Sequence, residues 1–227
     1  MSQNNKYLYL IWKDPQTRQN FTIGKLGYGS KYTFEYSRDV GKAEKNGWSK
    51  FEVFPDEKNY ESEVLFPVFA SRLPDKKRRD IDKILEKYNL SEFNEFELLK
   101  KSEGRLPIDT YSFIDPIFLE DDTIQRDFHI MGVRYHTPCK GNDCLLLPEV
   151  TVGDKLILEK EPENQFDVNA IKVLTQSGEL LGYVPRYYNE AILERLNKNM
   201  TYTCTIIDLN FKDCSECIKV RLNMPEE

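Results

Sequence analysis

One loop of the sequence places an aromatic ring beside a carboxylate. Residues 161–173 read EPENQFDVNAIKV, where Phe166 and Asp167 stand between Asn164 and Asn169, just before an apolar segment that is typical of a strand. Asn and Asp favour turns in which the side chain bonds a nearby backbone amide. The residues alone leave two interpretations open: a self-bonded turn with Phe166 folded back as a lid, or a loop that presents a ring and a carboxylate to a ligand.

Four of the five cysteines form two short pairs, Cys139 with Cys144 and Cys214 with Cys217. Cytosolic proteins do not usually keep disulfides. Two such pairs are what a four-cysteine zinc site needs, because tetrahedral zinc takes its sulfur ligands from two short turns. The pairs lie far apart in the chain, so a structural zinc ion requires the fold to bring them together. Free thiols are the alternative.

Length and composition limit the function classes. A chain of 227 residues with 40% apolar and 31% charged residues is typical of a soluble globular protein with one large or two small domains. A net charge of −6 disfavours sequence-independent binding along duplex DNA. No stretch approaches the ~18 apolar residues of a membrane span, and the start lacks the features of a signal peptide. We therefore expect a cytoplasmic protein without a membrane partner.

The first half mixes the periodicities of strands and helices. Residues 6–12 and 21–36 predict a strand and a hairpin. A helix face recurs over residues 81–88, and a second helix is predicted after a cap at Ser91, ending at Gly104. We expect an α+β amino-terminal domain, a mixed sheet with helices.

The second half is rich in short strands. Residues 116–126 read as the junction, which gives domains at 1–118 and 125–227. Candidate strands follow at 128–136, 155–160, 170–174, 180–184, 201–208 and 217–222, interrupted by one helix at about 186–197. Short strands with one interposed helix predict a mostly-β barrel.

The second half resembles the HIRAN domain family over about residues 127–223, in the ordered stretches FHIMGVRYHTP, GDKLILEKEPENQFDVNAIKV and LLGYVPRYYNEAI. The resemblance implies an OB-like barrel, and its members in repair proteins capture the 3′ end of single-stranded DNA. It implies that Phe166 stacks on a base and Asp167 accepts a hydrogen bond from the terminal sugar hydroxyl. The other DNA-binding positions that it implies are Arg134, Tyr135, Asn169, Tyr183 and Arg186.

The first half resembles, more loosely, the amino-terminal subdomain of HipA-type kinases over residues 7–115. The stretches are GKLGYGSKYTFEYS, YESEVLFPVFASRLPDKKRRDI and FELLKKSEGRLPIDTYSF. In split systems of that family this subdomain is a separate protein that holds the kinase toxin inactive. The resemblance implies docking to a HipA-type kinase encoded elsewhere, and a folded adaptor with another partner is the alternative.

No residue pattern predicts an enzyme. GKLGYGSK departs from a phosphate-binding loop in its Ser30-Lys31 order and in its predicted hairpin. Two functions stay open: a non-catalytic adaptor that captures single-stranded DNA ends, and an antitoxin-like component of a toxin–antitoxin or phage-defence system without DNA binding. The acidic residues near the loop, Glu159, Glu161 and Glu163, favour the second, because they repel phosphate.

Overall fold

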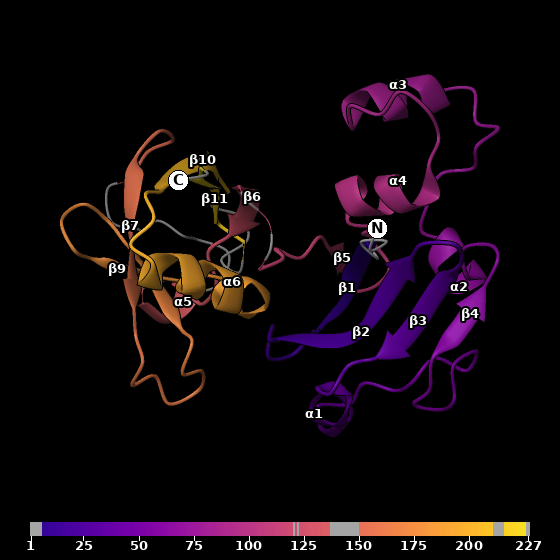
Figure 1. Cartoon of the computed structure of the whole chain (residues 1–227), viewed down its shortest axis with the longest axis horizontal. Coiled ribbons are helices and arrows are strands. Elements are labelled where there is room, and N and C mark those ends of the chain that lie inside the picture. The colour runs from indigo at the N-terminus through magenta and orange to yellow at the C-terminus, as the bar shows by residue number, and fades with distance from the viewer. Residues whose placement is uncertain (1–5, 120, 122, 137–149, 211–215, 226–227) are drawn as a thin grey trace. The chain divides into compact units, whose positions relative to one another are not determined.

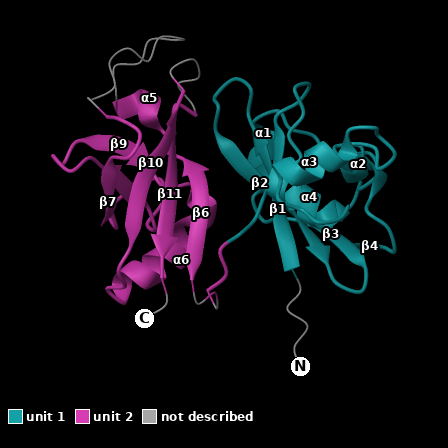
Figure 2. Ribbon diagram, turned by 90° about the horizontal axis from the view of Figure 1, so that it is seen from above, with its two compact units in different colours: residues 1–116 teal, residues 117–227 magenta. Residues whose placement is uncertain are grey.

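The chain folds into two compact units, residues 1–116 and 117–227, each with its own sheet (Figure 1, Figure 2). This computed structural model describes all residues except 1–5, 120, 122, 137–149, 211–215 and 226–227. In the described part of the chain, no helix has the length and apolar character needed to span a membrane.

Over residues 6–116, the first unit has five strands and four helices. The strands are β1 (Lys6–Lys13), β2 (Asn20–Tyr28), β3 (Tyr32–Tyr36), β4 (Tyr60–Ser62) and β5 (Tyr111–Ile114). The helices are α1 (Val40–Lys45), α2 (Pro67–Ala70), α3 (Ile81–Lys87) and α4 (Glu95–Ser102). The strands pair antiparallel in the order β4-β3-β2-β1-β5, and in Figure 1 α4 lies between this sheet and α3. The predicted α+β class is confirmed.

Aromatic side chains fill the core of the first unit. Successive residues of a strand point to opposite faces of the sheet, so Leu8 and Leu10 of β1 share one face. Both are buried. The ring of Phe69 lies 5.1 Å from that of Phe34 on β3 and 5.3 Å from that of Phe113 on β5, between centroids. Edge-on contacts of this kind add to the free energy of burial.

Two polar contacts explain sequence features of the first unit. Arg72, from the RLP stretch, donates to both carboxylate oxygens of Asp109 at 2.8 and 2.7 Å and to the carbonyl of Gly104 at 2.6 Å. It therefore links the end of α2 to the segment between α4 and β5. The predicted cap at Ser91 is wrong: the side chain of Asn94 accepts from the amide of Glu97 at 3.0 Å and begins α4. Asn94 stands at the N-cap with its side-chain oxygen toward the third residue of the helix.

The part of the second unit that the structure describes has six strands and two helices. The strands are β6 (Ile124–His129), β7 (Lys155–Lys160), β8 (Ile171–Leu174), β9 (Leu180–Tyr183), β10 (Thr203–Leu209) and β11 (Ile218–Met224). The helices are the single turn α5 (Val133–His136) and the longer α6 (Arg186–Asn197). The sheet order is β6-β11-β10-β7-β8-β9.

Backbone pairing between Met131 and Tyr183 joins the two ends of this sheet. The amide of Met131 donates to the carbonyl of Tyr183 at 2.8 Å, and the amide of Tyr183 donates back at 2.9 Å. The chain that continues from β6 therefore meets β9 and curls the sheet into the predicted OB-like barrel. Gly182 permits this approach, because a Cβ at its position would lie 2.4 Å from the carbonyl oxygen of Met131.

The predicted strand over 128–136 is wrong in its second part. β6 ends at His129, and Gly132, with φ of +77°, turns the chain into α5. Glycine adopts this backbone conformation readily, whereas other residues do so at a cost. Arg134 and Tyr135 therefore lie on a short helix and not in the predicted strand.

The junction with the first unit is anchored to α6. Arg195 is 4% exposed, and its guanidinium donates to the backbone carbonyls of Phe118, at 3.4 Å, and Asp121. Ile117 is also buried. Residues that follow Pro116 therefore contribute to the second unit.

Candidate nucleic-acid interface

The loop between β7 and β8 is a series of side-chain-stabilised turns. The Asn164 side-chain oxygen accepts from the amides of Phe166 and Asp167 at 2.9 and 3.1 Å. One carboxylate oxygen of Asp167 accepts from the amide of Asn169 at 3.0 Å. The interpretation as a self-bonded turn is therefore correct for Asn164 and Asp167, and the bonds give the loop a defined shape.

Phe166 is not a lid, because its ring is 89% exposed. Its amide is fixed by Asn164, so the ring stands outward from an ordered backbone. A single exposed apolar residue is ordinary on a protein surface. Here a defined turn holds the ring next to a carboxylate, so the self-bonded turn and the presentation of both groups occur together.

The carboxylate of Asp167 connects the loop to α6. Its Oδ2 lies 2.9 Å from the side-chain amide nitrogen of Asn189 and 3.6 Å from Nε of Arg186. Arg186 and Asn189 are one helical turn apart and share a face of α6. Asp167 is 17% exposed at its side chain while Arg186 is 63% exposed, so the cation is the more accessible member of the ion pair.

Glu161 ties the base of the loop to the barrel. Its carboxylate accepts from the side-chain amide nitrogen of Asn164 at 2.6 Å and lies 3.1 Å from Nζ of Lys172. The hydrogen bond from Asn164 lowers the pKa of the Glu161 carboxyl, and Lys172 and Tyr183 lower it further. Burial raises the pKa of the Tyr183 hydroxyl, and its bond to Glu161 raises it again. One carboxylate thus holds both the loop and the Tyr183 ring.

The rings of Tyr135 and Tyr183 lie at the point where the barrel closes. A Cβ built on Gly132 would lie 3.9 Å from the rings of both Tyr135 and Tyr183, so the two rings flank this glycine. The guanidinium carbon of Arg134 lies 4.7 Å above the Tyr135 ring centre, and the His136 ring lies 5.4 Å from that of Tyr183. Tyr135 is 72% exposed, which leaves much of its surface open to a stacking partner.

The structure therefore brings together most of the residues that the sequence singled out. Arg134, Tyr135 and Tyr183 meet around Gly132, and Asp167 meets Arg186. The bond of Tyr183 to Glu161, and of Glu161 to Asn164, links the first group to the loop. Asn169 takes part through its backbone amide.

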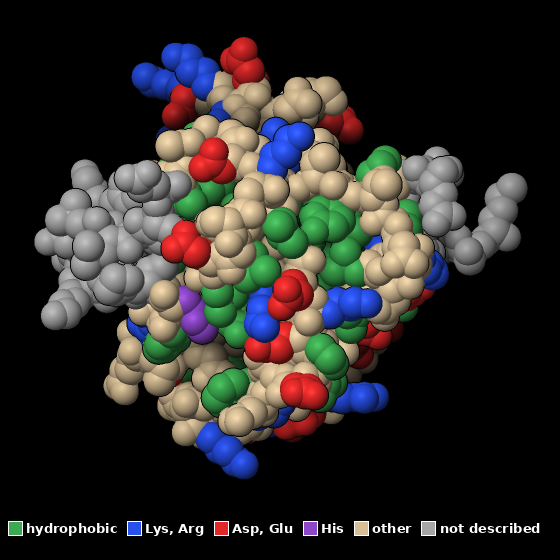
Figure 3. Space-filling view, turned by 90° about the vertical axis from the view of Figure 1, so that its left-hand side faces the viewer, with side chains coloured by type: hydrophobic (Ala, Val, Ile, Leu, Met, Phe, Trp, Pro, Cys, Tyr) green, Lys and Arg blue, Asp and Glu red, His purple; other side chains and the backbone are tan. Residues whose placement is uncertain are grey.

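The acidity near the loop is partly neutralised. Lys172 lies 3.4 Å from Glu159 and 3.1 Å from Glu161, because Lys172 pairs with Glu159 across β7 and β8 and its side chain reaches both carboxylates. Figure 3, which looks at the left-hand side of Figure 1, shows acidic and basic side chains interspersed, with hydrophobic side chains among them. A surface with charges of both signs suits a few local phosphate contacts better than continuous contact along a nucleic-acid backbone.

The zinc prediction falls mostly outside the described residues. Cys139, Cys144 and Cys214 lie there, whereas Cys217 is described and is 1% exposed directly before β11. Among the described residues, no group of three or more His, Cys, Asp or Glu could hold a metal ion. The four-cysteine site stays a prediction.

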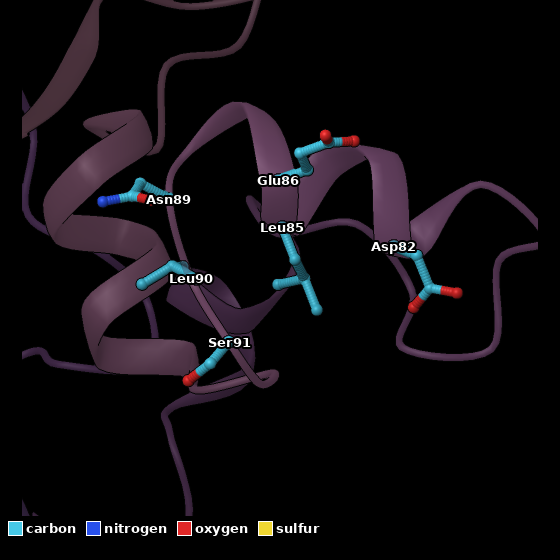
Figure 4. Close-up of a pocket in the computed structure, with 6 residues that line it drawn as sticks. All are labelled: Asp82, Leu85, Glu86, Asn89, Leu90 and Ser91. Carbon is cyan, nitrogen blue, oxygen red and sulfur yellow. The ribbon is translucent and has the colours of Figure 1, made fainter.

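The first unit has a separate surface depression at α3. Figure 4 shows Leu85 and Leu90 in it, with Ser91 at one end. The carboxylates of Asp82 and Glu86 point in different directions and do not converge on one point. They therefore do not form a cation site.

Comparison with family models matches residues 125–222 to the HIRAN domain and residues 18–107 to the HipA N-terminal domain. These two matches confirm both resemblances read from the sequence, in the order stated.

Two solved structures resemble the chain. The HIRAN domain of human HLTF is 19% identical, with 45% of this chain and 78% of that chain covered and a TM-score of 0.35. A protein from Lactobacillus plantarum is 23% identical, with 46% of this chain and 99% of that chain covered and a TM-score of 0.36. No curated protein matches the chain.

Sequence reasoning missed three parts of the interface: Glu161 as a hydrogen-bonding centre, Asn189, and Gly132 with Gly182. One signal was available, because Asn189 follows Arg186 by one helical turn in RYYNEAILERLN and so had to share its face. The glycines carried no such signal, since a need for φ > 0 or for close approach depends on the path of a distant strand.

Proposed function

We propose that the second unit binds the end of a single DNA strand through the surface formed by Phe166, Asp167, Arg186, Tyr135 and Arg134. The first unit serves as a docking domain, and the protein acts as a non-catalytic adaptor. The observation that carries the proposal is the fixed loop that holds an exposed Phe166 ring beside the Asp167–Arg186 pair.

The chemistry of the surface supports an end-binding mode. Exposed rings stack on bases of any sequence, and the two arginines offer planar donors for phosphate. A carboxylate accepts a hydrogen bond from a sugar hydroxyl but repels a phosphate at the same place. A strand end with a free sugar hydroxyl is therefore the part of a strand that best fits all three groups, and the resemblance to the HIRAN family implies that this is the 3′ end.

Fluorescence anisotropy with short single strands tests the proposal. Each strand is blocked or free at one end and measured over a salt series. Phe166→Ala should weaken binding by about 1–3 kcal/mol, the usual value of one stacked base. Two phosphate contacts should give a shallow slope of log K against log salt, roughly −1.4, and Arg134→Ala should make it shallower still.

Val168→Ala is the matched control, because Val168 is 70% exposed in the same loop but offers no ring. It should leave affinity unchanged. If every strand binds the wild-type protein no more tightly than ~100 µM, the nonspecific range at physiological salt, the loop has only a structural role. The barrel would then serve as an interaction scaffold.

A second function is favoured by the HipA N-terminal domain at residues 18–107. We propose that this domain docks a HipA-type kinase encoded elsewhere and restrains it, as an antitoxin-like component of a toxin–antitoxin or defence system. Co-expression and pull-down with such a kinase tests this, with residues 117–227 as the control bait. Absence of a complex with the full chain, together with unrelieved kinase toxicity, would contradict it.

A further inference from the structure

Asn189 is a buried polar residue without an evident role in the stability of the barrel. It is 4% exposed on α6, and its Oδ1 has no hydrogen-bond partner among the described residues. An unpaired acceptor in the interior costs free energy that an apolar residue would not. Its helix neighbours Tyr188 and Ile192 are buried too.

The hydrogen bond that this residue donates goes to the candidate site. The Asn189 side-chain nitrogen lies 2.9 Å from Oδ2 of Asp167. Unsatisfied buried groups in native proteins call for an explanation, and function is a common one. The unpaired oxygen and the donating nitrogen belong to the same side-chain amide. The free energy lost by burying the oxygen is therefore the cost of having a donor in place to orient Asp167.

We propose that Asn189 is a positioning residue that sets the preference of the site for a strand end with a free hydroxyl; this inference rests on the proposed DNA-end function. Among the described residues, the side chains of Asn189 and Arg186 contact Asp167, and both meet its Oδ2. Arg186 is exposed and is also a candidate phosphate ligand, so it cannot serve both groups at full strength. Once Arg186 turns to phosphate, Asn189 is the remaining side-chain donor that holds the carboxylate.

The remaining acceptor positions then face the ligand. A carboxylate offers about four acceptor positions, and Asp167 uses one on Oδ1 for the amide of Asn169. Asn189 is neutral and buried, so it fixes the carboxylate without drawing phosphate to itself. The position that Arg186 vacates on Oδ2 becomes available to a hydroxyl donor at the strand end.

The test compares two oligothymidine strands that differ only in the last group, a 3′-hydroxyl or a 3′-hydrogen. Their charge is the same, so the ratio of their dissociation constants isolates the hydrogen bond. For the full-length wild type we expect a preference of about tenfold for the hydroxyl, typical of a hydrogen bond to a charged group. In Asn189→Ala the preference should fall below about threefold, while the 3′-hydrogen strand should bind within about twofold of wild type.

A merely structural role gives a different result, because a loosened loop weakens both strands alike and leaves the ratio intact. Asn189→Leu, which fills the space of the amide, replaces Asn189→Ala if thermal unfolding shows that the smaller side chain fails to fold. Asn197→Ala is the control: the same residue type at the far end of α6, where it accepts from Lys160 at 3.0 Å. It should leave the ratio unchanged.

A double-mutant cycle shows whether Asn189 acts through Asp167. In Asp167→Ala the preference should be lost, and adding Asn189→Ala should change it no further. A wild type that binds neither strand would refute the proposed function itself. A wild type that binds both strands equally, or Asn189 variants that keep the wild-type ratio, would overturn this inference and leave DNA binding intact.

Discussion

Gly182→Ala should open the barrel at the point where the candidate interface is assembled. A Cβ at this position would lie 2.4 Å from the carbonyl oxygen of Met131, which is backbone and cannot rotate away. The φ of +154° is also one that residues with a side chain rarely adopt. Overpacking costs about 1–3 kcal/mol and a strained backbone about as much again.

These costs predict a loss of about 3 kcal/mol of unfolding free energy for the second unit. Unfolding entropy is about 2.1 cal/mol/K per residue. For the 111 residues from 117 to 227, that entropy converts the loss into a fall of roughly 13 °C in the melting temperature. Gly178→Ala is the matched control, because Gly178 also has positive φ, +87°, but a Cβ there meets nothing within 4 Å. It should cost only about 1–2 kcal/mol, the strain of a Cβ in a left-handed backbone conformation.

The assay can follow the two units separately. Both tryptophans, Trp12 and Trp48, are buried in the first unit, so their fluorescence reports that unit and should not change. Hydrogen exchange of peptides that span residues 128–136 and 180–184 reports the closure. If Gly182→Ala destabilises the second unit no more than Gly178→Ala does, then Met131 and Tyr183 are not paired in solution and the assembly of the site described above is wrong.

Three further predictions concern the loop, the cysteines and the junction. The folded-state pKa of Glu161 lies below its ordinary value, so its contribution to stability is present above pH ~4.5 and is lost as the pH falls through the lowered value. As the pH falls through that range, hydrogen exchange should rise first in residues 161–170. Glu161→Gln should abolish this rise. One zinc ion per chain should be held by Cys139, Cys144, Cys214 and Cys217, and a chelator should lower barrel stability, because metal-binding energy is folding energy; elemental analysis with no more than trace zinc in the purified protein would leave these residues as thiols. Limited proteolysis should cut first within residues 116–126, where Leu119 is 49% exposed, and earlier cuts within 153–184 would contradict the proposed boundary.

The sequence by itself determined the class of each half, and its resemblance to the HIRAN family indicated most of the residues at the candidate interface. Strand and helix periods are local properties of the chain, so the hairpin at 21–36 and the helix at 186–197 could be read directly. The turn of residues 164–169 is also local, because Asn and Asp bond amides two or three residues away.

Only the tertiary structure decided how these residues act together. One partner of Asp167, Asn189, is on a helix more than twenty residues away, and it could be given no role until that contact was known. Lys172 reaches Glu159 and Glu161 because of strand register, which no local pattern specifies. Gly182 is required because Met131 passes beside it. Contacts between distant segments set these roles, and the free energy of such contacts depends on the whole packed barrel.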